Sequence, residues 1–226
     1  MNIPLNIEAV REKMAAAAAA CGRKTEDVTL VAVTKTVDAA CAAEVLRCGV
    51  TNLGENRVQV FLDKYEALGD RPTWHLIGHL QTNKVKYIIG KVSLIHSVDT
   101  LHLAEEISKK AVSAGICQPI LVQFNISGEA SKSGAEAGEA KRMMEALAQM
   151  PGISVRGLMT MAPLGAPPEE TRRVFAGLRE LSQKIDAEHY PNVQMKELSM
   201  GMSGDFCEAI REGATLIRVG TALFRG

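Results

Sequence analysis

The stretch Thr29-Leu30-Val31-Ala32-Val33-Thr34-Lys35-Thr36 decides the fold. Its first five residues are apolar or β-branched, which is the composition of a strand buried on both faces of a parallel sheet. The apolar run ends at a lysine between two threonines. Because α/β folds bind ligands at the carboxyl ends of their parallel strands, the stretch predicts a buried strand and a candidate functional residue, Lys35.

Lys35 is a candidate nucleophile. We expect apolar neighbours to surround its ammonium group, and loss of hydration lowers the pKa of a lysine from about 10.4. A neutral amine can attack an aldehyde and form a Schiff base. A lysine at a strand end can also simply extend its charge into water. The functional interpretation therefore requires other residues that hold the ligand.

The rest of the chain alternates short apolar runs with helical patterns. We predict eight strands, at residues 28–34, 51–53, 73–77, 94–96, 120–125, 155–159, 196–198 and 215–219. Helices are expected between them, among them one that opens at 78–84 and one at 135–150. Eight strands with helical crossovers and no linker predict a single (β/α)8 barrel domain over 1–226. An open doubly wound sheet is the alternative.

An amphipathic helix at 1–22 is expected to pack on this barrel. Its apolar positions recur at helical spacing, at Ile7, Val10, Met14, Ala17 and Cys21. No segment approaches the length of a transmembrane helix, so we expect a cytoplasmic protein that does not enter a membrane.

The charge balance limits the partners. Lysine and arginine together number 26, and aspartate and glutamate also number 26, so no global field attracts nucleic acid or an anionic membrane. An anion site must therefore be local. Five scattered cysteines without C-x-x-C spacing are expected to be small buried side chains in a reducing compartment.

The segment Leu198-Ser199-Met200-Gly201-Met202-Ser203-Gly204-Asp205 indicates an anion site. Its glycines and serines lie between a predicted strand and a predicted helix, where backbone N–H groups and hydroxyls can bind a phosphate. A plain helix cap at Ser203 is the alternative. Arg218 lies in the last strand, where a buried cation needs an acceptor, and Gly220 allows close approach to a ligand. A phosphorylated aromatic aldehyde fits these residues together with Lys35.

The chain resembles the YggS/PROSC family of pyridoxal phosphate homeostasis proteins, which have the fold of the alanine racemase N-terminal domain. The matching motifs span nearly the whole chain. They are Val-Thr-Lys-Thr at 33–36, Gly-Glu-Asn-Arg at 54–57, Trp-His-Leu-Ile-Gly-His-Leu-Gln-x-Asn-Lys at 74–84, Ser-Lys-Ser-Gly at 131–134, Gly-Leu-Met-Thr-Met at 157–161, Leu-Ser-Met-Gly-Met-Ser-x-Asp at 198–205 and Ile-Arg-x-Gly at 217–220.

The resemblance implies a pyridoxal 5'-phosphate (PLP) site. Lys35 would form the internal aldimine, Arg218 would face the pyridine nitrogen, and Asn56 would lie beside the ring. The implied phosphate-binding residues are Ser199, Met200, Gly201, Met202, Ser203, Gly220 and Thr221. Lys132 matches a loop lysine of the family. Val37 stands where relatives often have a second lysine, so any role of that amine in cofactor transfer is in question here.

We hypothesise a monomeric PLP-binding protein that takes part in PLP homeostasis, with apo-enzymes as recipients and no strong catalytic activity. A guanidinium cannot protonate the pyridine nitrogen, so carbanion stabilisation is weak. A racemase would also need a second base, but Tyr65, Tyr87 and Tyr190 fall on outer helices. The alternatives are a PLP-dependent racemase or decarboxylase, a cofactor-free aldolase and a structural scaffold. No metal site is predicted, because His75 and His79 straddle a strand end.

Overall fold

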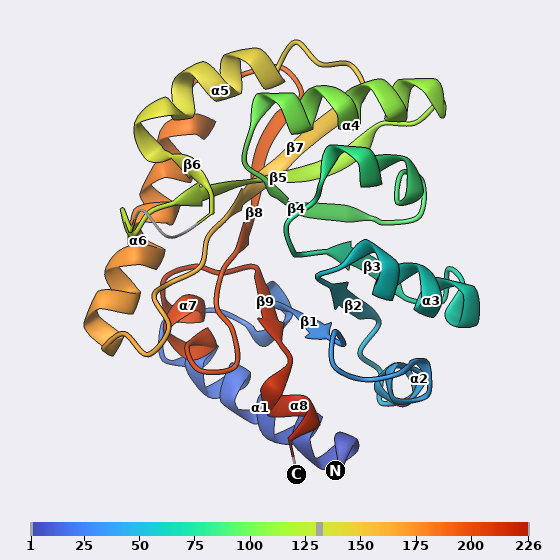
Figure 1. Ribbon diagram of the computed structural model, residues 1–226. Coiled ribbons are helices and arrows are strands. Elements are labelled where there is room, and N and C mark those ends of the chain that lie inside the picture. Colours follow the sequence, from blue (N-terminus) through green and yellow to red (C-terminus); the bar gives the residue numbers. More distant parts are fainter. Residues whose placement is uncertain (1, 130–132, 226) are drawn as a thin grey trace.

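The strands close into a parallel barrel in the computed structural model, which describes residues 2–129 and 133–225 (Figure 1). Their hydrogen-bonded order is β4-β3-β2-β1-β9-β8-β7-β5, and β5 pairs with β4 to complete the ring. The bounds are β1 Thr29–Val33, β2 Asn52–Glu55, β3 Thr73–Leu76, β4 Leu94–Val98, β5 Gln118–Asn125, β7 Ile153–Met159, β8 Val193–Ser199 and β9 Leu216–Val219. The (β/α)8 barrel is confirmed, and an open sheet is excluded because the β4–β5 pairing leaves no edge.

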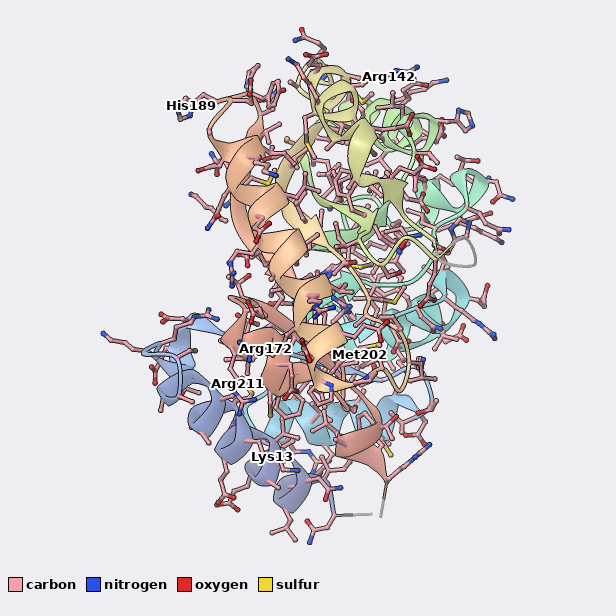
Figure 2. All side chains as sticks on the ribbon, turned by 90° about the vertical axis from the view of Figure 1, so that its left-hand side faces the viewer. Lys13, Arg142, Arg172, His189, Met202 and Arg211 are labelled. Carbon is pink, nitrogen blue, oxygen red and sulfur yellow. The ribbon has the colours of Figure 1, made fainter. Side chains whose placement is uncertain are left out.

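Helices cover the outside of this barrel, as the two views in Figures 1 and 2 show. The α-helices are α1 Ile3–Ala19, α2 Ala39–Arg47, α3 Val58–Leu68, α4 Leu101–Ser113, α5 Ala140–Leu147, α6 Pro168–Asp186, α7 Phe206–Arg211 and α8 Thr221–Phe224. Three short 3₁₀-helices are η1 Thr25–Asp27, η2 Thr82–Tyr87 and η3 Ala137–Glu139. No helix within the described part of the chain is long and apolar enough to cross a membrane.

The N-terminal helix α1 packs on α7 and α8. It begins after Asn2, whose side chain accepts a hydrogen bond from the N–H of Leu5. The Asn6 amide then donates to the carbonyls of Leu223 at 3.0 Å and Arg225 at 3.2 Å. These bonds hold the two ends of the described chain side by side (Figure 1).

Side chains alternate between the barrel interior and the helix layer. A small apolar cluster lies apart from the main core and consists of Val31, Leu94, Leu121, Met159 and Leu216. Their strand neighbours, such as Leu30 and Ala32, belong instead to the core between strands and helices. In the strands of this barrel, inward-facing side chains therefore alternate with outward-facing ones, and this alternation fixes the side chains that meet inside the barrel.

Two predicted helices differ from the structure. The segment expected to open a helix at 78–84 contains only the first residues of the 3₁₀-helix η2, because Ile77 still hydrogen-bonds to Glu55 and Gly78 lies against the backbone of Asn56. The helix expected at 135–150 is shorter, because β6 (Ala135–Glu136) first pairs with the end of β5.

The prediction of buried cysteines was wrong. Cys21 and Cys117 are exposed, and the other three cysteines are half-buried. Cys21 and Cys117 lie beyond the ends of α1 and α4, so the apolar stripes of those helices do not include them.

Candidate functional site

The predicted site residues follow neighbouring strands of the barrel. Lys35 lies two residues beyond β1, Asn56 directly follows β2, Ser199 ends β8, and Gly220 and Thr221 follow β9. These strands are consecutive in the order β2-β1-β9-β8. The structure therefore brings the predicted residues together on one arc of the carboxyl-terminal rim, where barrel enzymes and binding proteins hold their ligands.

The loop after β8 starts inside the barrel. Ser199 and Met200 are fully buried, and the N–H of Met200 donates to the carbonyl of Leu216 at 3.1 Å. The N–H of Thr160 donates to the carbonyl of Ser199 at 3.2 Å. Only from the half-buried Met202 onward does the loop reach the surface of the rim.

Ser203 joins this loop to the loop after β9. Its hydroxyl oxygen accepts the N–H of Gly220 at 3.3 Å and the N–H of Ala222 at 3.2 Å. Asp205, not Ser203, is the residue before α7, and its carboxylate accepts the N–H of Met202 at 2.5 Å. The serine is therefore a bridge between two rim loops, and the interpretation of Ser203 as a plain helix cap was wrong.

Backbone donors remain available on both loops. Gly201 has φ of +91° and a Cβ atom there would lie 2.5 Å from that of Ala209, so the turn requires glycine. Within residues 2–129 and 133–225, the N–H groups of Ser203, Gly204 and Thr221 donate no hydrogen bond. Unpaired amide donors on two adjoining loops fit an anion with several oxygen atoms.

Arg218 is a buried cation under these loops. Its Nη1 donates to the Ser199 hydroxyl at 2.5 Å, and its Nη2 donates to the Thr160 carbonyl at 2.9 Å. Its backbone N–H donates to the carbonyl of Gly201 at 2.9 Å. Burial lowers the pKa of the guanidinium to about 10, against the opposing charge of Asp205, so it remains charged at neutral pH.

A chain of side-chain hydrogen bonds extends from Arg218 across the barrel interior. Ser199 Oγ lies 2.8 Å from His96 Nδ1, His96 Nε2 lies 2.9 Å from His75 Nδ1, and His75 Nε2 lies 3.0 Å from Asn52 Oδ1. Arginine can only donate, so the Ser199 hydroxyl donates onward to His96. When both imidazoles are neutral and protonated at Nε2, His96 Nε2–H donates to His75 Nδ1 and His75 Nε2–H donates to Asn52 Oδ1. Every contact in the series then joins one donor to one acceptor.

The environment favours these neutral imidazoles. Burial lowers the pKa of His75 from its ordinary value of 6.5 to about 4. Burial, the neighbouring His75 and the charge of Arg218 hold the pKa of His96 well below that range. The two histidines are therefore hydrogen-bonded residues of the barrel interior that fix the direction of the Ser199 hydroxyl.

Lys35 is exposed, so the expectation of apolar surroundings was wrong. The pairing of β1 with β2 ends at Val33, and Lys35 lies in the turn in which the N–H of Val37 donates to the carbonyl of Thr34 at 3.1 Å. The side chain thus stands beyond the last apolar layer of the barrel. Within the described residues its amine makes no hydrogen bond or ion pair, and it is free to meet a ligand at the rim.

Asn56 is held by a close backbone contact. A Cβ atom on Gly78 would lie 2.3 Å from the carbonyl oxygen of Asn56, so only glycine allows this approach. Ser97 donates its hydroxyl to the carbonyl of Gly78 at 2.6 Å. These contacts fix the half-buried Asn56 next to the strand that carries Lys35.

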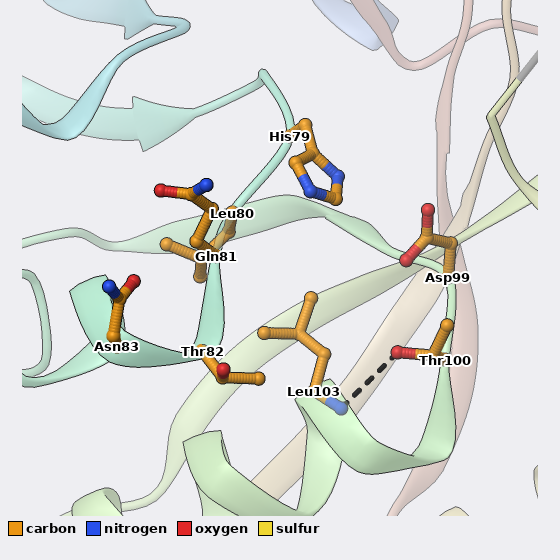
Figure 3. A pocket seen from close by; sticks show the side chains of 8 residues that line it. All are labelled: His79, Leu80, Gln81, Thr82, Asn83, Asp99, Thr100 and Leu103. Carbon is orange, nitrogen blue, oxygen red and sulfur yellow. Dashed lines mark hydrogen bonds between the residues drawn. The ribbon is translucent and has the colours of Figure 1, made fainter.

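Two cavities lie beside this arc. The larger, about 560 Å³, lies between the segment after β3 and the first turn of α4, and His79 and Asp99 lie near each other in its lining (Figure 3). Burial raises the pKa of Asp99, and the nearby His79 opposes that effect. A second cavity of about 410 Å³ shares His79 and Gln81 with the first and reaches Asn56. Neither is lined by Lys35 or Ser203.

Other predicted features have less connection to the rim. Both ring nitrogens of His75 take part in hydrogen bonds inside the barrel. The described residues contain no group of three or more potential histidine, cysteine or acidic ligands. Lys132 lies outside the described residues.

The barrel and the polar arc of its rim define a class of protein. The family model of the alanine racemase N-terminal domain matches residues 5–226, and the chain belongs to this family. A pyridoxal phosphate homeostasis protein of Aquifex aeolicus is 45% identical over 225 residues, which cover 99% of this chain and 98% of that protein.

Solved structures agree with this assignment. PipY of Synechococcus elongatus, solved with PLP bound, has a TM-score of 0.87 at 34% identity, covering 99% of this chain and 100% of that chain. An alanine racemase from Streptomyces lavendulae has a TM-score of 0.75 at 17% identity. The comparison covers 96% of this chain but 56% of the racemase, and it establishes a shared fold.

Proposed function

We propose that this protein binds PLP on the arc formed by β2, β1, β9 and β8, and that it takes part in intracellular PLP homeostasis. The observation that carries the proposal is the position of a free lysine amine and unpaired amide donors on adjacent strands of one rim. The relatives support it, since they include PLP homeostasis proteins and a PLP-bound structure.

The loops after β8 and β9 would hold the phosphate. The unpaired N–H groups of Ser203, Gly204 and Thr221 supply donors, and Ser203 keeps the two loops together through its hydroxyl. A doubly charged phosphate replaces water at these donors with little rearrangement, because the glycine turn at Gly201 is already formed.

Lys35 would hold the other end of the ligand. The cofactor supplies an aldehyde carbon, to which an amine nitrogen bonds with loss of one water molecule, giving a Schiff base. Lys35 is the residue of the arc that offers a free amine, and Asn56 lies on the neighbouring strand beside it. A reversible bond of this kind suits a protein that holds the cofactor and releases it to apo-enzymes.

Arg218 argues for binding rather than strong catalysis. A charged guanidinium only donates hydrogen bonds, so a ring nitrogen facing it stays unprotonated and the ring withdraws electrons weakly. The neutral histidine chain stabilises this arrangement, because Ser199 accepts from Arg218 and donates to His96. A racemase of the alanine racemase type would also need a base, whereas Tyr65 lies on the outer helix α3 and Tyr87 is exposed.

We further propose that the protein acts as a cytoplasmic monomer. Its rim site is built from residues of one chain, so no second copy is needed to complete it. Balanced charge gives it no general attraction to nucleic acid or membranes.

The test is the visible spectrum of the purified protein with PLP, before and after borohydride reduction. We expect a yellow species that borohydride converts into a stable adduct on Lys35, located by peptide mass analysis. Lys35→Ala should abolish the colour and the adduct. Lys13→Ala, on the outer face of α1 (Figure 2), is the matched control and should leave both unchanged.

An unchanged spectrum in Lys35→Ala contradicts the covalent assignment. A colourless protein that borohydride traps only with a ketone substrate would instead indicate an aldolase. Exchange of the α-proton of L-amino acids in deuterium oxide on a turnover scale would favour a racemase.

A further inference from the structure

A buried ion pair lies directly behind the strand ends that carry Lys35 and Asn56. Lys64 of α3 places its Nζ 2.5 Å from Glu55 Oε1 and 2.5 Å from the carbonyl oxygen of Thr34. The Thr34 hydroxyl donates to the same Glu55 oxygen at 2.5 Å. The residue directly after β1, the last residue of β2 and a residue of α3 therefore meet at one polar cluster between the barrel wall and the helix layer.

This cluster is poorly suited to a purely stabilising role. Thr34 and Glu55 are fully buried and Lys64 is 4% exposed. Within the described residues, Glu55 Oε2 is also the one buried side-chain nitrogen or oxygen atom without a hydrogen-bond partner. Burying two charges costs hydration free energy that their attraction often fails to recover, and an unpaired oxygen adds to that cost. Apolar side chains would fill the same space with less penalty.

The position of the cluster relates it to the rim. Lys64 donates to the carbonyl of the peptide bond that joins Thr34 to Lys35. Glu55 is the last residue of β2 and directly precedes Asn56. Fixing Thr34 at both its carbonyl and its hydroxyl restricts the backbone from which the Lys35 side chain extends. The same carboxylate restricts the backbone next to Asn56.

We infer that Glu55 and Lys64 are positioning residues, which hold the Lys35 amine in line with the ligand aldehyde without touching the ligand. This inference rests on the proposed PLP site. Small displacements of a reacting group reduce rates strongly, by up to about a hundredfold for 1 Å. The pair should therefore affect the bond-forming step at Lys35, whereas the phosphate donors of the β8 and β9 loops lie on other strands and should be unaffected.

The test separates these two events. Pyridoxine 5'-phosphate carries the phosphate and ring but no aldehyde, so its affinity measures binding alone. The rate at which PLP becomes reducible onto Lys35 measures bond formation. In the double variant Glu55→Gln/Lys64→Met, we expect unchanged affinity for pyridoxine phosphate and bond formation slowed by at least about tenfold.

The half-buried pair Glu106 and Lys110 on α4, 3.6 Å apart, offers a matched control nearer the surface. Glu106→Gln/Lys110→Met makes the same chemical changes and should behave as wild type in both measurements. If the buried double variant does not fold, Thr34→Val removes the hydroxyl that donates to Glu55 and should slow bond formation severalfold.

Bond formation at the wild-type rate in a folded variant overturns the inference. A loss of pyridoxine phosphate affinity as large as the loss in the rate of bond formation also overturns it, because it would indicate a structural role. Failure of the wild-type protein to form any adduct while it binds pyridoxine phosphate would instead overturn the proposed covalent function, and the positioning role with it.

Discussion

The neutral histidine pair inside the barrel predicts a specific sensitivity to acid. In the unfolded chain His75 takes up a proton as the pH falls below its ordinary pKa of 6.5, but in the folded protein it does so only near pH 4. Between these values the unfolded state binds more protons, so the free energy of unfolding falls as the pH falls. The loss over the whole window is about 3 kcal/mol for His75, at about 1.4 kcal/mol per pH unit.

His96 acts in the same direction, because its pKa in the folded protein is also depressed. The assay is urea unfolding at several pH values between about 7 and 4.5, which lie across this window. His75→Gln keeps a donor and an acceptor but cannot be protonated, so its stability should decrease less steeply with falling pH. The slope should differ from wild type by about 1.4 kcal/mol per pH unit.

His102→Gln is the control, because His102 is exposed on α4 and should leave the slope unchanged. His189, which projects from the end of α6 in Figure 2, offers a second exposed control. Parallel slopes for wild type and His75→Gln would refute the assignment of a neutral His75, as would a His75 resonance that titrates near its ordinary pKa.

Three further predictions concern the rim and the core. Gly201→Ala should lower the free energy of unfolding by at least about 1 kcal/mol, because φ of Gly201 is +91°. Gly204→Ala should lower it less, because no atom would contact the added Cβ. Equal losses would contradict the requirement for glycine at 201. Trp74→Ala should cost about 3–5 kcal/mol in urea unfolding, since the side chain is 1% exposed, and a loss below about 1 kcal/mol would contradict its place in the core. Ser203→Ala leaves the N–H groups of Gly220 and Ala222 unpaired and should weaken PLP binding by about tenfold in a fluorescence titration. Ser113→Ala, on the exposed end of α4, is the control and should not weaken binding. Unaltered binding in Ser203→Ala would remove Ser203 from the site.

The barrel could be predicted from local sequence because its determinants are local. The apolar run before Lys35 is dense enough to identify a buried strand, and each of the eight predicted strands overlaps an observed one. The segments that differed depend on distant contacts. No α-helix begins at Gly78, because this residue lies against the backbone of Asn56. Ala135 forms a strand pair with β5, which precedes it in the chain.

The candidate site was predictable only in part. Strand-end position and composition identified Lys35 and the loop of 198–205, since a parallel barrel brings all strand ends to one rim. The exposure of Lys35 was missed, because sequence alone does not show how far a strand's pairing extends. The burial of the cysteines was mispredicted for a similar reason, since Cys21 and Cys117 lie beyond the ends of α1 and α4.

The buried polar groups were the least accessible to sequence reasoning. The position of Lys64 between Phe61 and Leu68 on the apolar face of α3 indicates that it is buried. Its partners Thr34 and Glu55 lie at the ends of two strands, and the helix sequence does not specify them. The hydrogen bond between His75 and His96 depends on the register of β3 and β4, which their sequences do not specify.

The grouping of the site on contiguous strands has a consequence for how this rim could change. The loops after β3, β4 and β5 lie outside the arc that contains Lys35 and Ser203, and the cavity between His79 and Asp99 opens beside them. Insertions there would alter which molecules approach a ligand at the proposed site without changing the loops after β8 and β9. Four of the eight strand ends thus carry the proposed site, and the loops after β3, β4 and β5 are positions at which access to it could be engineered.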